Sequence, residues 1–226
     1  MLKLVLMPSK NIIKTYVENG YYHLYNRGVE KRTIFLDDRD YKTFLHFFKI
    51  YLSPSTDPFS KIETLADEIK LLAYCLLPNH FHLLVKQRTR DAITKFIRRV
   101  CTNYAMYFNK RYERLGPLFQ GNYKAVLIKT DEQLLHLSRY IHINPEETIK
   151  PVSKLLDYPY SSYAEYLDKR KTKWIYPQEI LSFFKTARRA SLKDVLSYQS
   201  FVEDYSEESE EILKGFTLEE VKRVQP

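Results

Sequence analysis

The segment LLAYCLLPNHFHLLVK, residues 71–86, contains two apolar runs separated by a Pro-Asn pair. The first run, 71–77, carries no charge and is typical of a fully buried strand, which Pro78 and Asn79 bring to an end. A second strand is predicted over 80–86. Because only the Pro-Asn pair separates the two runs, we expect them to form a β-hairpin.

The flanking sequence supplies the other elements of an α+β domain. Residues 21–25 are β-prone, and apolar side chains at helical spacing predict a helix over about 38–52, which Asp37 or Asp38 can cap. After the hairpin we expect a long helix from near Asp91 and a strand over 123–129. A last helix, over 130–144, is capped by Thr130 or Asp131 and stopped at Asn144 by the proline that follows. The order β-α-β-β-α-β-α is that of a ferredoxin-like, split βαβ fold, an antiparallel sheet with helices on one face.

The 226 residues suit one domain with an appendage, and a chain of this length can bury roughly 70% of its unfolded surface. After residue 150 the signals weaken to short helical pieces, which are predicted over 161–167, 178–184, 192–201 and 218–224. We therefore place a boundary there, between a core domain over 1–150 and a mostly helical extension over 151–226. The extension ends in an acidic tail: residues 203–226 hold eight acidic and three basic side chains, net −5. Since the whole chain carries +8, residues 1–202 carry +13.

Composition excludes several classes of protein. The five glycines form neither a G-x-G-x-x-G nor a G-x-x-x-x-G-K-[ST] motif, so we expect no nucleotide cofactor. Cys75 and Cys101 form no C-x-x-C pair, which favours a reduced, cytoplasmic protein over a disulfide framework or a cysteine zinc site. No export signal is found, and the longest uncharged run, 71–85, is too short and too polar to span a bilayer, so we expect no membrane function.

Positive charge is concentrated between residues 86 and 124, where ten basic side chains stand against two acidic ones and aromatic residues are interleaved. Such a mixture suits the phosphates and the stackable bases of a nucleic acid. A solvated helix face explains the charge equally well. Several aromatic residues are expected in the core instead: Phe44, Phe48, Phe96 and Tyr104.

Candidate chemistry lies in the hairpin and in the last helix of the core. In a strand, successive side chains point to opposite faces, so the imidazoles of His80 and His82 point the same way, about 6–7 Å apart, and could share a metal ion. A pair of surface histidines on a polar sheet face is the alternative. Tyr140 and Asn144 lie one helical turn apart, where a phenol and an amide oxygen could act as nucleophile and metal ligand. With 19 tyrosines in the chain, a half-buried aromatic is the alternative for Tyr140.

Four stretches of sequence carry a family resemblance that extends from about Tyr21 to Tyr166. They are YHLYNRG at 22–28, LPNHFHLLV at 77–85, LFQGNYK at 118–124 and YIHINP at 140–145. Together they resemble the REP-associated tyrosine transposases, which belong to the single-tyrosine HUH nucleases alongside small insertion-sequence transposases. His-x-His alone is a weak signal, but in combination with Tyr-x-x-x-Asn-Pro about 60 residues later it is a specific one.

The resemblance implies a ferredoxin-like core and an endonuclease that uses a divalent metal, Mg²⁺ or Mn²⁺, on single-stranded DNA, typically at hairpin-bearing ends. Matched residue by residue, Tyr140 is the nucleophile, and His80, His82 and Asn144 hold the metal. Related insertion-sequence enzymes have Gln where Asn144 stands. The product would be a 5′-phosphotyrosine and a free 3′-hydroxyl, and since one ester replaces another, rejoining needs no ATP.

Contacts to DNA are expected from side chains that match recurrent positions of the family and from the basic stretch. They are Arg27 and Gln120, and then Arg88, Arg90, Lys95, Arg98, Arg99 and Lys124. The expected partner is single-stranded or hairpin DNA, bound by a monomer or a homodimer.

Two other functions are compatible with the sequence. A nucleic-acid-binding module on the same fold, which no longer cleaves, would explain the basic stretch. A zinc hydrolase could use His80 and His82, although no carboxylate at a matching spacing stands out as a third ligand.

Overall fold

The computed structural model describes residues 15–55, 59–147, 149, 152–185 and 197–204. The strands are β1 (Tyr21–Arg27), β2 (Ile69–Leu77), β3 (His80–Gln87) and β4 (Lys124–Ile128). They form one sheet in the order β2-β3-β1-β4, in which every neighbouring pair is antiparallel. β1 and β2 thus run in the same direction with β3 between them, and the predicted ferredoxin-like, split βαβ fold is confirmed.

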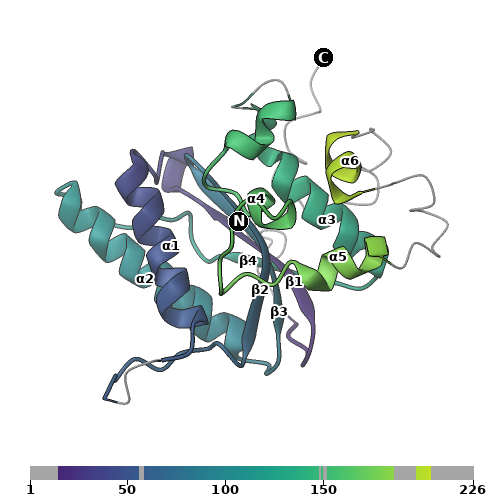
Figure 1. The fold of residues 1–226 in the computed structure, drawn as a ribbon. Coiled ribbons are helices and arrows are strands. Elements are labelled where there is room, and N and C mark those ends of the chain that lie inside the picture. Colours follow the sequence, from purple (N-terminus) through teal and green to yellow (C-terminus); the bar gives the residue numbers. More distant parts are fainter. Residues whose placement is uncertain (1–14, 56–58, 148, 150–151, 186–196, 205–226) are drawn as a thin grey trace, which may run out of the picture.

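One face of the sheet is covered by α1 (Asp38–Leu52) and α2 (Ala92–Arg111) (Figure 1). Asp37 caps α1, because its side chain accepts a hydrogen bond from the backbone N–H of Asp40. The aromatic residues that we expected in this core are all fully buried: Phe44, Phe48, Phe96 and Tyr104. No helix in the described ranges is both long enough and apolar enough to cross a membrane.

The opposite face is covered by α3 (Asp131–Ile143) and by elements that follow it (Figure 1). These are η2 (Asn144–Glu147), η3 (Val152–Asp157), α4 (Tyr163–Tyr166), α5 (Gln178–Lys185) and α6 (Tyr198–Glu203). We predicted helices on one face of the sheet, and α1 and α2 form that layer. The structure differs in that α3 and the C-terminal elements form a second layer on the opposite face. A second layer is needed because β2 is apolar on both faces: Leu71 faces the first core, and Leu72 and Cys75 face the second.

The free edge of β2 is closed by the chain's own C-terminal segment. The backbone N–H of Leu76 donates to the carbonyl of Tyr160 at 2.9 Å, and the N–H of Tyr176 donates to the carbonyl of Leu71 at 2.9 Å. This segment therefore occupies the edge at which another chain could otherwise add a strand. The described part of the predicted extension packs on β2 and α3, whereas residues 205–226, which make up most of the acidic tail, lie outside the described residues.

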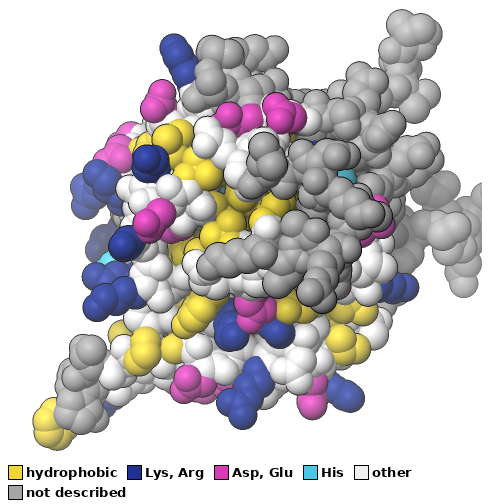
Figure 2. Space-filling model, turned by 45° about the vertical axis from the view of Figure 1, so that its right-hand side comes forward, with side chains coloured by type: hydrophobic (Ala, Val, Ile, Leu, Met, Phe, Trp, Pro, Cys, Tyr) yellow, Lys and Arg dark blue, Asp and Glu magenta, His cyan; other side chains and the backbone are white. Residues whose placement is uncertain are grey.

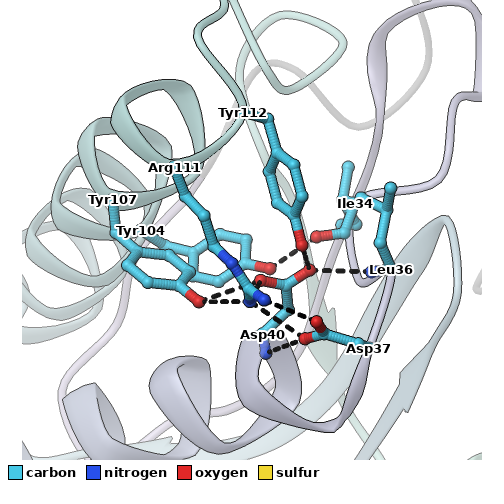
Figure 3. Close-up of polar contacts among 8 residues, drawn as sticks. All are labelled: Ile34, Leu36, Asp37, Asp40, Tyr104, Tyr107, Arg111 and Tyr112. Atoms are coloured by element: carbon cyan, nitrogen blue, oxygen red, sulfur yellow. Dashed lines mark hydrogen bonds and ion pairs between the residues drawn. The ribbon is translucent and has the colours of Figure 1, made fainter.

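A buried carboxylate joins the start of α1 to the end of α2 (Figure 3). Asp40 has no exposed surface, and its two oxygens accept hydrogen bonds from Tyr107, Tyr112, Arg111 and the backbone N–H of Leu36, at 2.7–2.9 Å. A buried charge is tolerated only when it is paired and hydrogen-bonded in this way. The network thereby fixes the loop that precedes α1.

That loop in turn fixes the β2–β3 turn. The backbone N–H groups of Ile34 and Phe35 both donate to the carbonyl of Pro78, at 2.7 and 3.0 Å. Gly28 donates its N–H to the carbonyl of Asn79 at 2.8 Å and must be glycine, because a Cβ there would stand 2.2 Å from the carbonyl oxygen of Arg32. The turn that precedes His80 is therefore held from two sides.

Candidate active site

Side chains from two central strands and one helix meet on the face of the sheet that α3 covers. Arg27 of β1 lies opposite His80 of β3, and Tyr25 lies opposite His82, so all four share this face. Tyr140 of α3 lies over them: its ring centroid is 5.4 Å from that of His82. The structure thus brings together the predicted nucleophile and the predicted pair of histidines.

The two histidines differ in their burial. His82 has no exposed surface, and His80, at the start of β3, is half-buried. Their ring centroids are 4.9 Å apart, with the rings perpendicular. A pair of surface histidines on a polar face, the alternative explanation of the motif, does not describe this arrangement, because α3 covers the face.

The tautomer of His80 follows from its neighbour. Its Nδ1 lies 2.6 Å from the side-chain oxygen of Asn79, whose amide nitrogen donates to the carbonyl of Lys31. Because a carboxamide oxygen only accepts, Nδ1 of His80 carries the proton and Nε2 carries the lone pair. Nε2 is therefore the atom with which His80 can bind a cation.

His82 is a buried, neutral imidazole. Burial, together with the neighbouring His80 and His23, holds the pKa of His82 well below its ordinary value. Its Nδ1 lies 2.9 Å from Nε2 of His23, whereas its own Nε2 is buried and has no hydrogen-bond partner within the described structure. Such an orphaned polar atom costs about 1–3 kcal/mol, and a metal ion would satisfy it. The residues present therefore fit a divalent cation.

The third predicted ligand, Asn144, lies where α3 ends. Its backbone N–H donates to the carbonyl of Tyr140, so the two residues are one turn apart, as expected. The side chain of Asn144 is half-buried. Over the described residues, no group of three or more His, Cys, Asp or Glu side chains could hold a metal, so the described structure supplies no third ligand of these types for a zinc hydrolase.

Two neighbours in the site were not predicted from the sequence: His23 and Tyr25 of β1. The ring of His23 is fully buried, 5.1 Å from that of His82 and 6.3 Å from that of Tyr140. Tyr25 packs 4.8 Å from His23 and 6.0 Å from His82. Both belong to the YHLYNRG stretch, but their proximity to His82 depends on the register between β1 and β3, which composition and spacing leave open.

The residues predicted to contact DNA fall into two groups. Arg27, Gln120 and Lys124 lie at the end of the sheet that carries His80: Arg27 donates a hydrogen bond from Nε to the side-chain oxygen of Gln120. Lys124 of β4 lies opposite Tyr25, two residues before Arg27 on β1. Burial, and then the positive charge of Arg27, lower the pKa of Lys124. This group is placed beside the two histidines.

The other five residues are not brought to the site. Arg88 and Arg90 follow the far end of β3, eight or more residues beyond His80 and thus about 25 Å along the strand. Lys95, Arg98 and Arg99 lie on α2, on the opposite side of the sheet. Lys95 pairs with Asp91, and Arg99 with Glu63. In the view of Figure 2, Lys and Arg side chains are interspersed with acidic ones.

Comparison with known proteins identifies the family to which the chain belongs. Residues 16–144, which include the whole sheet and helices α1 to α3, match the family of IS200-like transposases. Among solved structures, a REP-associated tyrosine transposase bound to a REP hairpin shares the fold, with 17% identity over 73% of this chain and 95% of that chain and a TM-score of 0.52. A putative transposase from Deinococcus radiodurans matches with 15% identity over 60% of this chain and 95% of that one, at a TM-score of 0.36. No curated protein matches the sequence. The matched span exceeds half of the chain, so this protein is a DNA transposase of the IS200-like family.

Proposed function

We propose that this transposase is a metal-dependent endonuclease and strand transferase for single-stranded DNA that works through a 5′-phosphotyrosine. The observation that carries the proposal is the contact of the Tyr140 ring with the ring of His82, whose Nε2 is buried without a hydrogen-bond partner in the described structure. A phenol that could attack a phosphate therefore lies beside a nitrogen that could hold a cation.

In this proposal Nε2 of His80 and Nε2 of His82 hold Mg²⁺ or Mn²⁺, and the amide oxygen of Asn144, one turn beyond Tyr140, completes the protein's share of the site. Phosphate and water oxygens fill the remaining positions, which suits a hard cation. When bound, the cation supplies Lewis acidity toward a non-bridging phosphate oxygen.

The oxygen of Tyr140 attacks the phosphorus of the DNA strand, and the bond from phosphorus to the 3′-oxygen breaks. The phenol gives up its proton, and the departing 3′-oxygen takes one up, so that a free 3′-hydroxyl remains. Since an ester is exchanged for an ester, the reverse attack by a 3′-hydroxyl rejoins the DNA without ATP. Catalysis of this kind depends on position and on the stabilisation of charge.

Arg27 and Lys124 are proposed to bind phosphates next to the scissile one, with Gln120 holding the guanidinium of Arg27 in place. A hairpin-bearing repeat is the proposed substrate, because the solved transposase of the same fold is bound to such a hairpin. The chain would act as a monomer or as a dimer that does not extend the sheet at β2. The described cysteines, Cys75 and Cys101, are free, which suits a cytoplasmic protein.

The test is incubation of the protein with Mn²⁺ and single-stranded hairpin DNA labelled at its 3′ end, followed by denaturing electrophoresis. A labelled covalent adduct is expected, and it should disappear with chelator or in Tyr140→Phe. Tyr176→Phe is the matched control, because the Tyr176 hydroxyl makes no hydrogen bond in the described structure and its ring lies beside Lys70, at the end of the sheet away from His80. An adduct that survives Tyr140→Phe would contradict the assignment. Salt-sensitive binding without any adduct, unchanged by chelator or by His80→Ala, would indicate a non-cleaving binding module instead.

A further inference from the structure

The strongest unassigned feature is a pair of buried imidazoles on neighbouring central strands. His23 of β1 and His82 of β3 both have no exposed surface. Nε2 of His23 lies 2.9 Å from Nδ1 of His82, and the two rings are stacked with 22° between their planes. The pairing of Tyr25 with His82 and of His23 with Leu84 makes the two histidines diagonal neighbours on one face of the sheet.

A hydrogen bond between two neutral imidazoles holds one proton, which belongs to one of the two facing nitrogens. If Nε2 of His23 carried it, then Nδ1 of His82 would accept and Nε2 of His82 would bear a proton. That N–H would be buried with no acceptor in the described structure. If Nδ1 of His82 carries the proton instead, Nε2 of His82 is a lone pair, which is the form that a cation requires.

We infer that His23 is a positioning residue: it accepts a hydrogen bond from Nδ1 of His82 and so keeps the lone pair of His82 on Nε2, facing the metal site. The inference rests on the proposed function, in which His82 holds the cation. Its neighbour His80 presents the same atom, because Asn79 fixes the proton of His80 on Nδ1. The two ligands are thus prepared in the same tautomer by two different partners, one from the β2–β3 turn and one from β1.

The surroundings of His23 keep its ring from turning away. Tyr25, on the same strand face, packs 4.8 Å from it, and Tyr140 packs on it edge-on at 6.3 Å. Val126 of β4 lies opposite it on its other side. A hydrogen-bond acceptor so confined gives His82 one orientation as well as one tautomer, which is the role that outer partners of metal-bound histidines serve. Because His23 is neutral as an acceptor, it achieves this without adding a negative charge beside the DNA phosphate.

The test uses His23→Leu, which removes the acceptor, and His23→Gln, which offers an amide oxygen in its place. His142→Gln is the matched control for the loss of a fully buried histidine, because the hydrogen bonds of the His142 ring within the described residues go to Tyr198 and Ser162 and not to His23 or His82. Binding of Mn²⁺ alone is measured by titration calorimetry. We expect the affinity to fall about 10- to 100-fold in His23→Leu and to change less than about 3-fold in His23→Gln and His142→Gln.

The tautomer itself is read in the unmodified, metal-free protein, labelled with ¹⁵N-histidine, from long-range ¹H–¹⁵N spectra. The expected result is a proton on Nδ1 of His82. A proton on Nε2, or unchanged Mn²⁺ affinity in a folded His23→Leu protein, would overturn the role of His23. If His23→Leu does not fold, the tautomer of the unmodified protein and the affinity of His23→Gln still decide. If the unmodified protein binds no Mn²⁺, or if His80→Ala binds it equally well, the proposed metal site is wrong and the inference falls with it. If His80→Ala loses Mn²⁺ binding but His23→Leu keeps it, only the inference about His23 is contradicted.

Discussion

The ring of Tyr140 meets the ring of His82 edge to face, with 5.4 Å between the centroids and 83° between the planes. Tyr140 belongs to α3 and His82 to β3, so the docking of α3 on the sheet sets the separation between nucleophile and metal ligand. That docking depends on Leu134, Leu137 and Ile141, which are buried in the second core. The chemistry proposed here is therefore built on a helix–sheet contact rather than on a loop.

The first prediction separates the two members of this contact. His82→Ala should lose both Mn²⁺ binding and the DNA adduct, because it removes the buried nitrogen that would hold the cation. Tyr140→Phe should lose the adduct by at least about 10³-fold yet keep Mn²⁺ affinity within about 3-fold, since the ring that packs on His82 remains. Calorimetry and the adduct assay measure the two quantities. Equal loss of Mn²⁺ binding in both variants would mean that the hydroxyl of Tyr140 belongs to the metal site.

The second prediction concerns the two groups of basic residues. Arg27→Ala should weaken binding to hairpin DNA and reduce the slope of log affinity against log salt by about 1, because one phosphate contact is lost beside His80. Arg98→Ala, an exposed cation on α2 across the sheet, is the control and should leave both quantities unchanged. Fluorescence anisotropy between 50 and 200 mM salt, roughly the range in which such contacts are resolved, is the measurement. A larger effect from Arg98 than from Arg27 would place the DNA on the α2 side.

The third prediction concerns the buried carboxylate that orders the approach to the β2–β3 turn. Asp40→Asn removes the charge that Arg111, Tyr107 and Tyr112 surround, and it leaves at least one buried donor without an acceptor (Figure 3). We expect a loss of about 3–5 kcal/mol in the free energy of unfolding, measured by urea denaturation. Asp168→Asn, at an exposed position paired only with the exposed Lys171, is the control and should change it by less than about 0.5 kcal/mol. A stable Asp40→Asn protein would show that the network is dispensable.

Much of the fold could be predicted because it depends on local chemistry. The hairpin, the caps at Asp37 and Thr130 and the stop at Asn144 all follow from residue types and spacing, and the structure places them where expected. After residue 150, the pieces predicted over 161–167 and 178–184 are helical at α4 and α5. Of the piece predicted over 192–201, residues 198–201 are helical in α6, 192–196 lie outside the described residues, and the piece at 218–224 lies wholly outside them.

The part that could not be predicted is non-local. His23 lies beside His82 because of the register between β1 and β3, and no sequence pattern indicates that the two residues are neighbours. The burial of the histidine face likewise depends on α3 folding back over the sheet, which periodicity does not show. For the same reason the basic stretch could not be divided in advance: Lys124 lies beside the site and Arg98 does not, although both contribute equally to the charge count.

The last prediction is a loss of stability in acid that comes from buried histidines. Burial lowers the pKa of His142 to about 3, because the neutral ring is enclosed between Tyr198 and Ser162. Its ordinary value is 6.5, so as the pH falls below 6.5 the unfolded chain takes up a proton at His142 before the folded protein does. The contribution is fully present above pH 6.5 and is lost between 6.5 and about 3, at up to about 1.4 kcal/mol per pH unit.

Urea denaturation at a series of pH values between 7 and 4 measures this slope. In His142→Gln the slope should be smaller by about one proton, while the free energy of unfolding at pH 7 falls by roughly 1 kcal/mol, because glutamine replaces the two hydrogen bonds imperfectly. Met106→Gln, at an exposed side chain on α2 that carries no titratable group, is the control, and its slope should equal that of the unmodified protein. An unchanged slope in His142→Gln would mean that the folded and the unfolded chain take up the proton of His142 over the same pH range, and that burial does not lower its pKa.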